Sequence, residues 1–492
     1  MIPLTMMALK CLVAFGPPSG PVASPPSAET PPSPGNDWPA VVEWTPEHYA
    51  LDLAIDYESQ QIRGEAEITV RNQGDGPLGI LPVLLYRLMQ VTGVQGPNGQ
   101  DLAFSQGVET YEDYDRLQVD FIQVTLPEPV EPGDRITVSL DYQGYLAGLS
   151  EAYPYVKETI DPAFTIIRDD SDAYPTIGYP SRNANRFRPM NRWSYDARIT
   201  VPDSLVVANG GELVQRNLHN GLVTYYYRSR VPSWRMDFAV APYVSETSGN
   251  NTVFALPEDA GVLPDLLTAM DRALALYTEW FGPLKAYDGL AVIEIPQGFG
   301  SQTDATAIIQ RAEAFKDPSR FHELDHELSH KWNVKATDEH PPRIEEGLAV
   351  FLESLTVEAL EDRSYLDSYM DSILDYLRGV YARHPERASV PLARYGDAGM
   401  EGMSYTVGAV FFRLLYARVG PEAFRTIFRD LYAQQSETGA DIQEVMAYIR
   451  NDAGTHVDDL LQDWIFGTRY GELIRDGAGI EDLLAIYSSP PP

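Results

Sequence analysis

The chain has 492 residues, enough for several domains, and 44% of them are hydrophobic, so it can bury large cores. Its 71 acidic and 37 basic residues give a formal net charge of -34, which repels nucleic acid phosphate and anionic lipid and excludes both as expected partners. A single cysteine, Cys11, excludes an intrachain disulfide and a cysteine-ligated metal site.

The first 40 residues are predicted to be a leader followed by a flexible linker. A short apolar stretch, interrupted by Lys10, precedes a tract of proline, serine and alanine that continues to Pro34. This order favours an exported or periplasmic protein, and a disordered tail is the alternative. No other stretch reaches the roughly 18 apolar residues that a membrane span needs, so no transmembrane span is expected.

Residues 41–248 are predicted to form an antiparallel β-sandwich or saddle domain. Tyr49, Leu51 and Leu53 begin an alternating hydrophobic pattern, and turns rich in glycine, proline and asparagine interrupt the strands. No cluster of titratable residues stands out in the sequence of this segment. Its expected role is therefore that of a scaffold.

The hydrophobic period changes after about residue 250, and residues 249–480 are predicted to form a mainly helical domain with a small β-sheet. Leu263 and Pro264 open its first helix, and Gly282 ends it. Residues 481–492 are expected to be a tail. Two short strands are predicted at residues 290–295 and 305–309, and further helices at residues 347–363, 403–418, 421–434, 440–451 and 455–466.

The segment His322–Lys331 contains the pattern His-Glu-x-x-His twice, overlapping at His326. On a helix, His326 and His330 lie one turn apart on the same face, and Glu327 lies beside them. Two imidazoles and a nearby carboxylate can hold zinc and leave one position open for water. Four of the eight histidines fall within nineteen positions, which favours a metal site over a solvated helix face.

The next predicted helix supplies the carboxylates. Leu348, Phe351 and Leu352 form an apolar stripe, and it places Glu346 and Glu353, which are two turns apart, near the buried edge. Because buried acids need partners, we expect Glu346 to ligate zinc and Glu353 to accept the N–H of a ligating imidazole. The expected cofactor is one zinc ion per chain, held by His326, His330 and Glu346.

The pattern His326-Glu327-x-x-His330-x-Trp332-Asn333, followed by Glu346-Gly347 and Glu353, resembles the gluzincin metallopeptidases of the aminopeptidase N family. The run from His330 to Lys335 is also similar to the glycyl aminopeptidase family. The alternating residues from 49 to 72 resemble the opening strands of the aminopeptidase N β-domain, so the resemblance covers about residues 41–470. It implies a thermolysin-like zinc catalytic domain over residues 249–480, and a metallopeptidase acting on peptide substrates near their amino termini.

The resemblance also implies individual roles. Glu327 would be the general base toward the attacking water, and Tyr405, in Ser404-Tyr405-x-x-Gly408, would stabilise the oxyanion. A substrate-binding edge strand is expected in or beside the segment 298–304, because glycines let another chain approach closely, although an ordinary glycine loop is the alternative. The residues expected to bind substrate there are Gly298, Phe299, Gly300, Ser301 and Gln302.

Two departures from the family pattern leave alternatives open. The family normally has eighteen residues between the second histidine and the glutamate, whereas fifteen separate His330 from Glu346. The upstream set of His322, His326 and Glu345 restores eighteen, with Glu323 as the base. We prefer the downstream set because the residues that follow His330 and Glu346 match the family.

The second departure concerns the substrate. The family's Gly-Ala-Met-Glu-Asn strand, whose glutamate binds a free amino terminus, is replaced by residues 298–304, which contain no glutamate. An endopeptidase or other amide hydrolase on the same scaffold therefore stays open. A non-catalytic protein in which zinc only joins helices is a third alternative, but the intact Glu327 argues against it because a structural metal needs no general base.

Overall fold

The computed structural model describes residues 38–361 and 364–487, so most of the predicted leader and linker lies outside the described residues. The chain divides into two compact units, a β-unit and a helical unit. The β-unit contains the described residues up to 267 together with residues 286–318. The helical unit contains residues 268–285 and the described residues from 319 onward.

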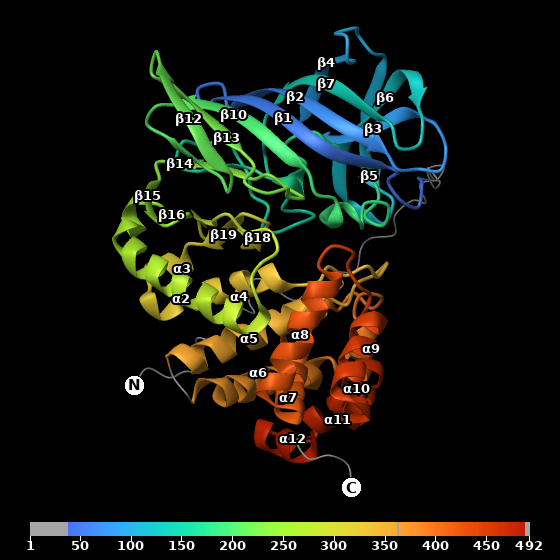
Figure 1. Cartoon of the computed structure of the whole chain (residues 1–492), viewed down its shortest axis with the longest axis vertical. Coiled ribbons are helices and arrows are strands. Elements are labelled where there is room, and N and C mark those ends of the chain that lie inside the picture. The colour runs from blue at the N-terminus through green and yellow to red at the C-terminus, as the bar shows by residue number, and fades with distance from the viewer. Residues whose placement is uncertain (1–37, 362–363, 488–492) are drawn as a thin grey trace, which may run out of the picture. The chain divides into compact units, whose positions relative to one another are not determined.

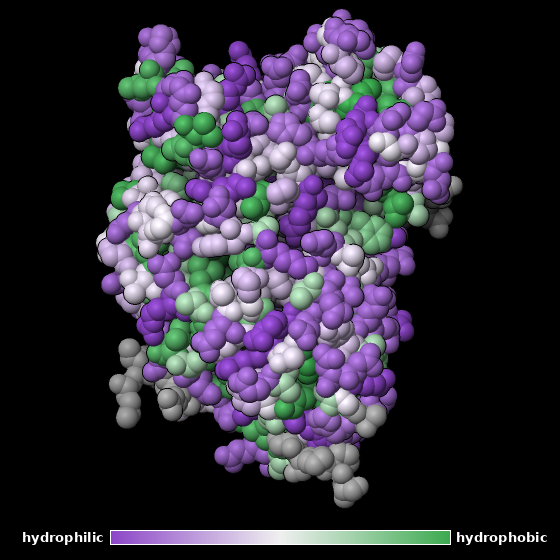
Figure 2. Space-filling view, in the orientation of Figure 1, coloured by the Kyte–Doolittle hydropathy of each residue, from purple (hydrophilic) through white to green (hydrophobic). Residues whose placement is uncertain are grey.

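On the face shown in Figure 2, hydrophilic side chains predominate, in keeping with the high net charge.

The largest sheet of the β-unit has seven strands in the order β12-β13-β10-β1-β2-β7-β4 (Figure 1). Neighbouring strands are antiparallel except for β1 and β10, which run parallel. Burial alternates along β1, where Leu51 and Leu53 face the core, so one face of the sheet packs inward. The strands are β1 (Trp44–Asp56), β2 (Gln61–Asn72), β4 (Met89–Gln95), β7 (Arg135–Gly144), β10 (Ser194–Pro202), β12 (Glu212–His219) and β13 (Leu222–Arg228).

Two smaller antiparallel sheets complete the predicted β domain, with the orders β5-β6-β3-β9 and β11-β14-β8. A continuous hydrophobic core contains residues of both the seven-stranded and the four-stranded sheet. The strands are β3 (Leu78–Tyr86), β5 (Phe104–Tyr111), β6 (Tyr114–Val130), β8 (Thr165–Ile167), β9 (Thr176–Ile177), β11 (Val206–Ala208) and β14 (Phe238–Ala241). The prediction of an amino-terminal β domain is confirmed.

The β-unit also contains a buried ion network, which corrects the prediction that this region has no titratable cluster. Arg235 Nη2 lies 2.8 Å from Asp170 Oδ2 and 2.7 Å from Asp237 Oδ2. Arg168, with no exposed surface, lies 3.0 Å from Asp170 and 3.6 Å from Glu158. Arg168 and Asp170, like Arg235 and Asp237, are only two residues apart, but 65 residues separate Asp170 from Arg235, so folding must bring the two pairs together.

A five-stranded mixed sheet in the order β15-β16-β17-β19-β18 belongs to the β-unit. β16, β17 and β19 are parallel, and β15 and β18 pair antiparallel at the two edges. The strands predicted at residues 290–295 and 305–309 are β17 and β19, and β18 is an edge strand within the segment 298–304. The strands are β15 (Val244–Ser248), β16 (Asn251–Ala255), β17 (Ala291–Ile295), β18 (Gln302–Thr303) and β19 (Ala307–Arg311).

Helices form the second unit, as predicted, although three of them were not expected. α6 and α11 lie in stretches with no assigned element, and α12 covers most of the expected tail because Ile480, Leu483 and Tyr487 are buried at helical spacing. No helix in the described ranges is long and apolar enough to cross a membrane. The helices are α2 (Leu263–Phe281), α4 (Glu323–Ser329), α5 (Ile344–Leu360), α6 (Tyr365–Arg383), α7 (Ser404–Val419), α8 (Pro421–Gln435), α9 (Ile442–Ala453), α10 (Asp458–Leu461), α11 (Arg469–Arg475) and α12 (Ile480–Tyr487), with α3 (Glu313–Lys316) in the β-unit.

Candidate metal centre and active site

Three side chains of the helical unit converge with their donor atoms facing one another. His326 lies on α4, His330 follows that helix, and Glu346 lies in the first turn of α5. The Nε2 atoms of His326 and His330 lie 3.3 Å apart, and each is 3.3 Å from Oε2 of Glu346. The three side chains are 14%, 13% and 8% exposed, so the donor triangle is largely shielded from water.

The donor triangle has the dimensions of a zinc site. A tetrahedral zinc ion with bonds of about 2.0 to 2.1 Å keeps its donors roughly 3.3 Å apart. Calcium and magnesium prefer oxygen donors, whereas two imidazole nitrogens and one carboxylate suit zinc. These residues therefore fit the predicted zinc ion, and three protein donors would leave a fourth position open.

The backbone around α4 explains why the two histidines share a face. α4 ends at Ser329, and the chain continues as a 3-10 turn over His330–Trp332, which keeps His330 one turn from His326. Ser329 Oγ donates a hydrogen bond of 2.7 Å to the His326 carbonyl oxygen. Trp332 is buried and its indole N–H donates to the Gly282 carbonyl oxygen at 2.8 Å, so the end of the turn is anchored inside the unit.

Polar side chains contact Nδ1 of both imidazoles, the ring nitrogen that lies outside the donor triangle. Glu353 on α5 places Oε2 at 3.5 Å from Nδ1 of His326, the contact predicted for a residue that orients a ligand. The side-chain amide of Asn333 contacts Nδ1 of His330. Each imidazole therefore has one ring nitrogen in the donor triangle and the other against a polar group.

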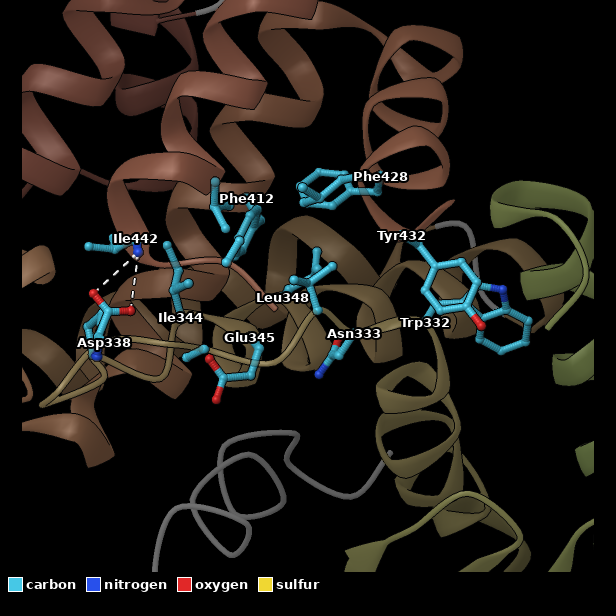
Figure 3. A pocket seen from close by; sticks show the side chains of 16 residues that line it. Trp332, Asn333, Asp338, Ile344, Glu345, Leu348, Phe412, Phe428, Tyr432 and Ile442 are labelled. Carbon is cyan, nitrogen blue, oxygen red and sulfur yellow. Dashed lines mark hydrogen bonds between the residues drawn. The ribbon is translucent and has the colours of Figure 1, made fainter. Parts of the chain in front are cut away.

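The upstream ligand set is not assembled. Within residues 38–361 and 364–487, the group placed to hold a metal is His326, His330 and Glu346. His322 instead lies 2.7 Å from Oε1 of Glu353 through its Nδ1. Glu345 lines a neighbouring apolar pocket with Leu348 and Phe412, as Figure 3 shows. The geometry thus favours the downstream set, even though its spacing departs from the family pattern.

The side chains of the donor triangle and its neighbours stabilise one another in their charged forms. Burial disfavours an ionised Glu346, yet the charges of Arg343 and His330 hold the pKa of its carboxyl well below its usual range. Burial also disfavours a charged His326, but hydrogen bonds with Glu346 and Glu353 raise the pKa of this imidazole to about 10. A zinc ion would have to displace that proton, so metal binding should strengthen as pH rises.

Tyr405 reaches the cluster because α5 and α7 pack together at two glycines. A Cβ added at Gly347 would lie 2.5 Å from Cα of Gly408 and 2.6 Å from the Ser404 carbonyl oxygen, so any larger residue would push the helices apart. The Tyr405 ring stacks on His326 with 6.1 Å between ring centroids and 1° between planes. Burial raises the pKa of Tyr405 well above its usual range, which keeps its phenol protonated and able to donate.

Glu327, the predicted general base, is on α4 beside His326 and is 9% exposed. Its charge is one of the causes that raise the pKa values of His326 and Tyr405, in keeping with its place next to His326 on α4. The structure therefore brings together His326, His330, Glu346, Glu327, Tyr405 and Glu353, as expected. Their roles in chemistry stay predictions.

Arg343 is a residue of this cluster that sequence analysis missed. It precedes α5 in the left-handed conformation, with φ of 59°, which is uncommon for a residue other than glycine. Its guanidinium contacts the carboxylate of Glu346 and lies 5.8 Å from the centroid of the Tyr405 ring. No motif marks such a residue, because its position follows from how the chain enters the helix.

The predicted substrate-binding segment belongs to the β-unit, where its side chains make internal contacts. Phe299 packs edge-on against Phe164, and Ser301 Oγ accepts a hydrogen bond from the Arg311 N–H at 3.1 Å. Arg168 of the ion network donates to Gln302. Gly298 has φ of 96°, and a Cβ at Gly300 would press on Tyr155. Contact with substrate stays a prediction for these residues.

Comparison with solved structures shows the same two-domain fold elsewhere. The crystal structure of an M1 zinc metallopeptidase from Deinococcus radiodurans matches with a TM-score of 0.64 over 86% of this chain and 94% of that chain, at 21% identity. A mutant of that protein bound to a Tyr-Ser-Ala substrate matches with a TM-score of 0.63. The predicted fold class, a β domain followed by a mainly helical domain with a small β-sheet, is confirmed.

Sequence comparison finds relatives of the same kind. Aminopeptidase M1-B of Oryza sativa subsp. japonica is 22% identical over 300 residues, and aminopeptidase A of Gloydius brevicauda is 21% identical over 467 residues. The matches cover 56% and 85% of this chain but only 34% and 46% of those proteins. No model of a known protein family matches. At 21% to 22% identity, the chain is similar to M1 zinc metallopeptidases and aminopeptidases, in line with the resemblance that its motif carries.

Zinc content of four single variants should distinguish the two ligand sets. We expect His330→Ala and Glu346→Ala to lose zinc, because each removes one corner of the donor triangle. His322→Ala and Glu345→Ala should retain nearly the wild-type zinc content. The measurement is metal analysis after dialysis, with circular dichroism to verify folding. Zinc retained by His330→Ala and lost by His322→Ala would reverse the assignment.

Proposed function

We propose that this protein is a zinc-dependent peptidase that hydrolyses peptide bonds as an aminopeptidase. The observation that carries the proposal is the donor triangle of His326, His330 and Glu346, with Glu327 intact beside it. One zinc ion per chain, bound there, would polarise the substrate carbonyl and make the attacking water more acidic. The names of both aminopeptidase relatives, and the peptide bound by the Deinococcus protein, support a peptide substrate.

The chain's own residues would supply the proton transfers and the second stabilising group. Glu327 is a nearly buried carboxylate one residue after a ligand, suited to take a proton from the attacking water and return it to the leaving nitrogen. Tyr405 keeps its phenolic proton, so it can donate a hydrogen bond to the carbonyl oxygen as negative charge develops there. Arg343 contacts Glu346 and so helps to fix the third ligand.

An endopeptidase is the second candidate function, because the segment 298–304 lacks the glutamate that would bind a free amino terminus in the family. A panel of fluorogenic peptides, each made with a free and with an acetylated amino terminus, tests both. Cleavage of only the free forms would support the aminopeptidase, and equal cleavage of both forms the endopeptidase. No cleavage of any peptide by zinc-loaded protein would contradict both.

Glu327→Gln should reduce peptide hydrolysis by roughly 10²-fold or more while zinc content stays unchanged, because the amide cannot act as a base. Glu323→Gln is the matched control, since Glu323 holds the equivalent place in the upstream motif. Its rate should stay near that of the wild type. The assignment fails if Glu327→Gln keeps full activity or if Glu323→Gln is the variant that loses it.

Tyr405→Phe should lower kcat by about 10²-fold with little change in KM, since the hydroxyl is needed only as the oxyanion forms. Tyr416→Phe on the same helix, remote from the donor triangle, serves as the control and should behave as the wild type. Steady-state kinetics on one peptide suffice. A raised KM with an unchanged kcat would make Tyr405 a substrate-binding residue instead.

A further inference from the structure

We infer that His322 is a positioning residue that fixes the carboxylate of Glu353 and, through it, the imidazole of His326. The inference rests on the proposed zinc site. His322 Nδ1 lies 2.7 Å from Oε1 of Glu353, and Oε2 of the same carboxylate lies 3.5 Å from Nδ1 of His326. A single carboxylate thus joins two imidazoles that are one helical turn apart.

The orientation of His326 depends on what its second ring nitrogen meets. An imidazole that ligates through Nε2 carries its hydrogen on Nδ1, and this N–H needs an acceptor. Oε2 of Glu353 is that acceptor for His326. The terminal torsion of a glutamate side chain is soft, so a carboxylate held at one oxygen alone could rotate away. The hydrogen bond from His322 to the other oxygen prevents this rotation.

The hydrogen bond between His322 and Glu353 is strengthened by burial of both side chains. The side chains of His322 and Glu353 are 18% and 9% exposed, so water competes poorly for their hydrogen bond. The ring of Tyr365 on α6 lies 6.2 Å from the His322 ring and limits its movement. Removal of His322 would leave Oε1 of Glu353 buried without this donor, which costs free energy and favours rotation of the carboxylate toward another donor.

The outer histidine of the upstream motif therefore has a use that requires no direct contact with metal. Its four-residue spacing from His326 puts both rings on one face of α4, where one carboxylate from α5 can reach both. A ligand role would instead need a ring nitrogen of His322 in the donor triangle. The structure directs Nδ1 of His322 to Glu353.

The zinc dissociation constant, measured by competition with a chromophoric chelator, tests this inference. His322→Phe fills the space but removes the donor, and it should weaken zinc binding about 10-fold, the lower end of the effect known for groups that orient ligands. His322→Gln keeps an N–H donor and should restore most of the affinity. His340→Phe, the same change at an exposed loop histidine, should bind zinc as the wild type does.

A double-mutant comparison separates positioning from a general loss of stability. In a Glu353→Ala background, His322→Phe should cause no further loss of zinc affinity, because Glu353 is the proposed link. Equal losses in both backgrounds would overturn the inference, as would an unchanged affinity in folded His322→Phe. His322→Ala provides the same comparison if the phenylalanine variant is unstable. Absence of zinc binding by the wild type would instead contradict the proposed function.

Discussion

Three donors held 3.3 Å apart by protein contacts alone are the feature on which the rest of the helical unit depends. Imidazoles and carboxylates of opposite charge attract, but they keep this spacing only if each side chain is also held from outside the triangle. Glu353 does this for His326, Asn333 for His330, and Arg343 for Glu346. The helices that carry these residues must then pack with little freedom, because a shift of one ångström would open the triangle.

The helices that carry the donors are held tightly together at one close contact. α5 carries both Glu346 and Glu353, and it meets α7 where Gly347 faces Gly408, so that Tyr405 is brought over His326. The same contact therefore sets the distance between the third ligand and the residue proposed to stabilise the oxyanion. A substitution at either glycine would act on chemistry through helix spacing, although neither residue carries a functional group.

The sequence favours the observed donor triangle because part of the information is local, although the spacing alone leaves the upstream set open. His326 and His330 are four residues apart on one helix, and an apolar stripe marks the buried side of Glu346. It was insufficient for Arg343, whose contact with Glu346 depends on the left-handed backbone before α5, and for the contact of His322 with Glu353, which forms only when α4 and α5 pack. The same limit explains the buried ion network of the β-unit, in which Arg235 meets Asp170 from 65 residues away. Amphipathic patterns at α6 and α12 were local signals, and the predicted helices did not include them.

Anomalous diffraction at the zinc absorption edge, from crystals of protein purified without chelators, is the most direct test of the zinc site. One strong peak per chain is expected, at about 2.0 to 2.1 Å from Nε2 of His326, Nε2 of His330 and a carboxylate oxygen of Glu346. His322 should lie outside bonding distance of that peak and remain against Glu353. A peak bonded to His322 or Glu345, or no peak in zinc-supplemented crystals, would contradict this assignment.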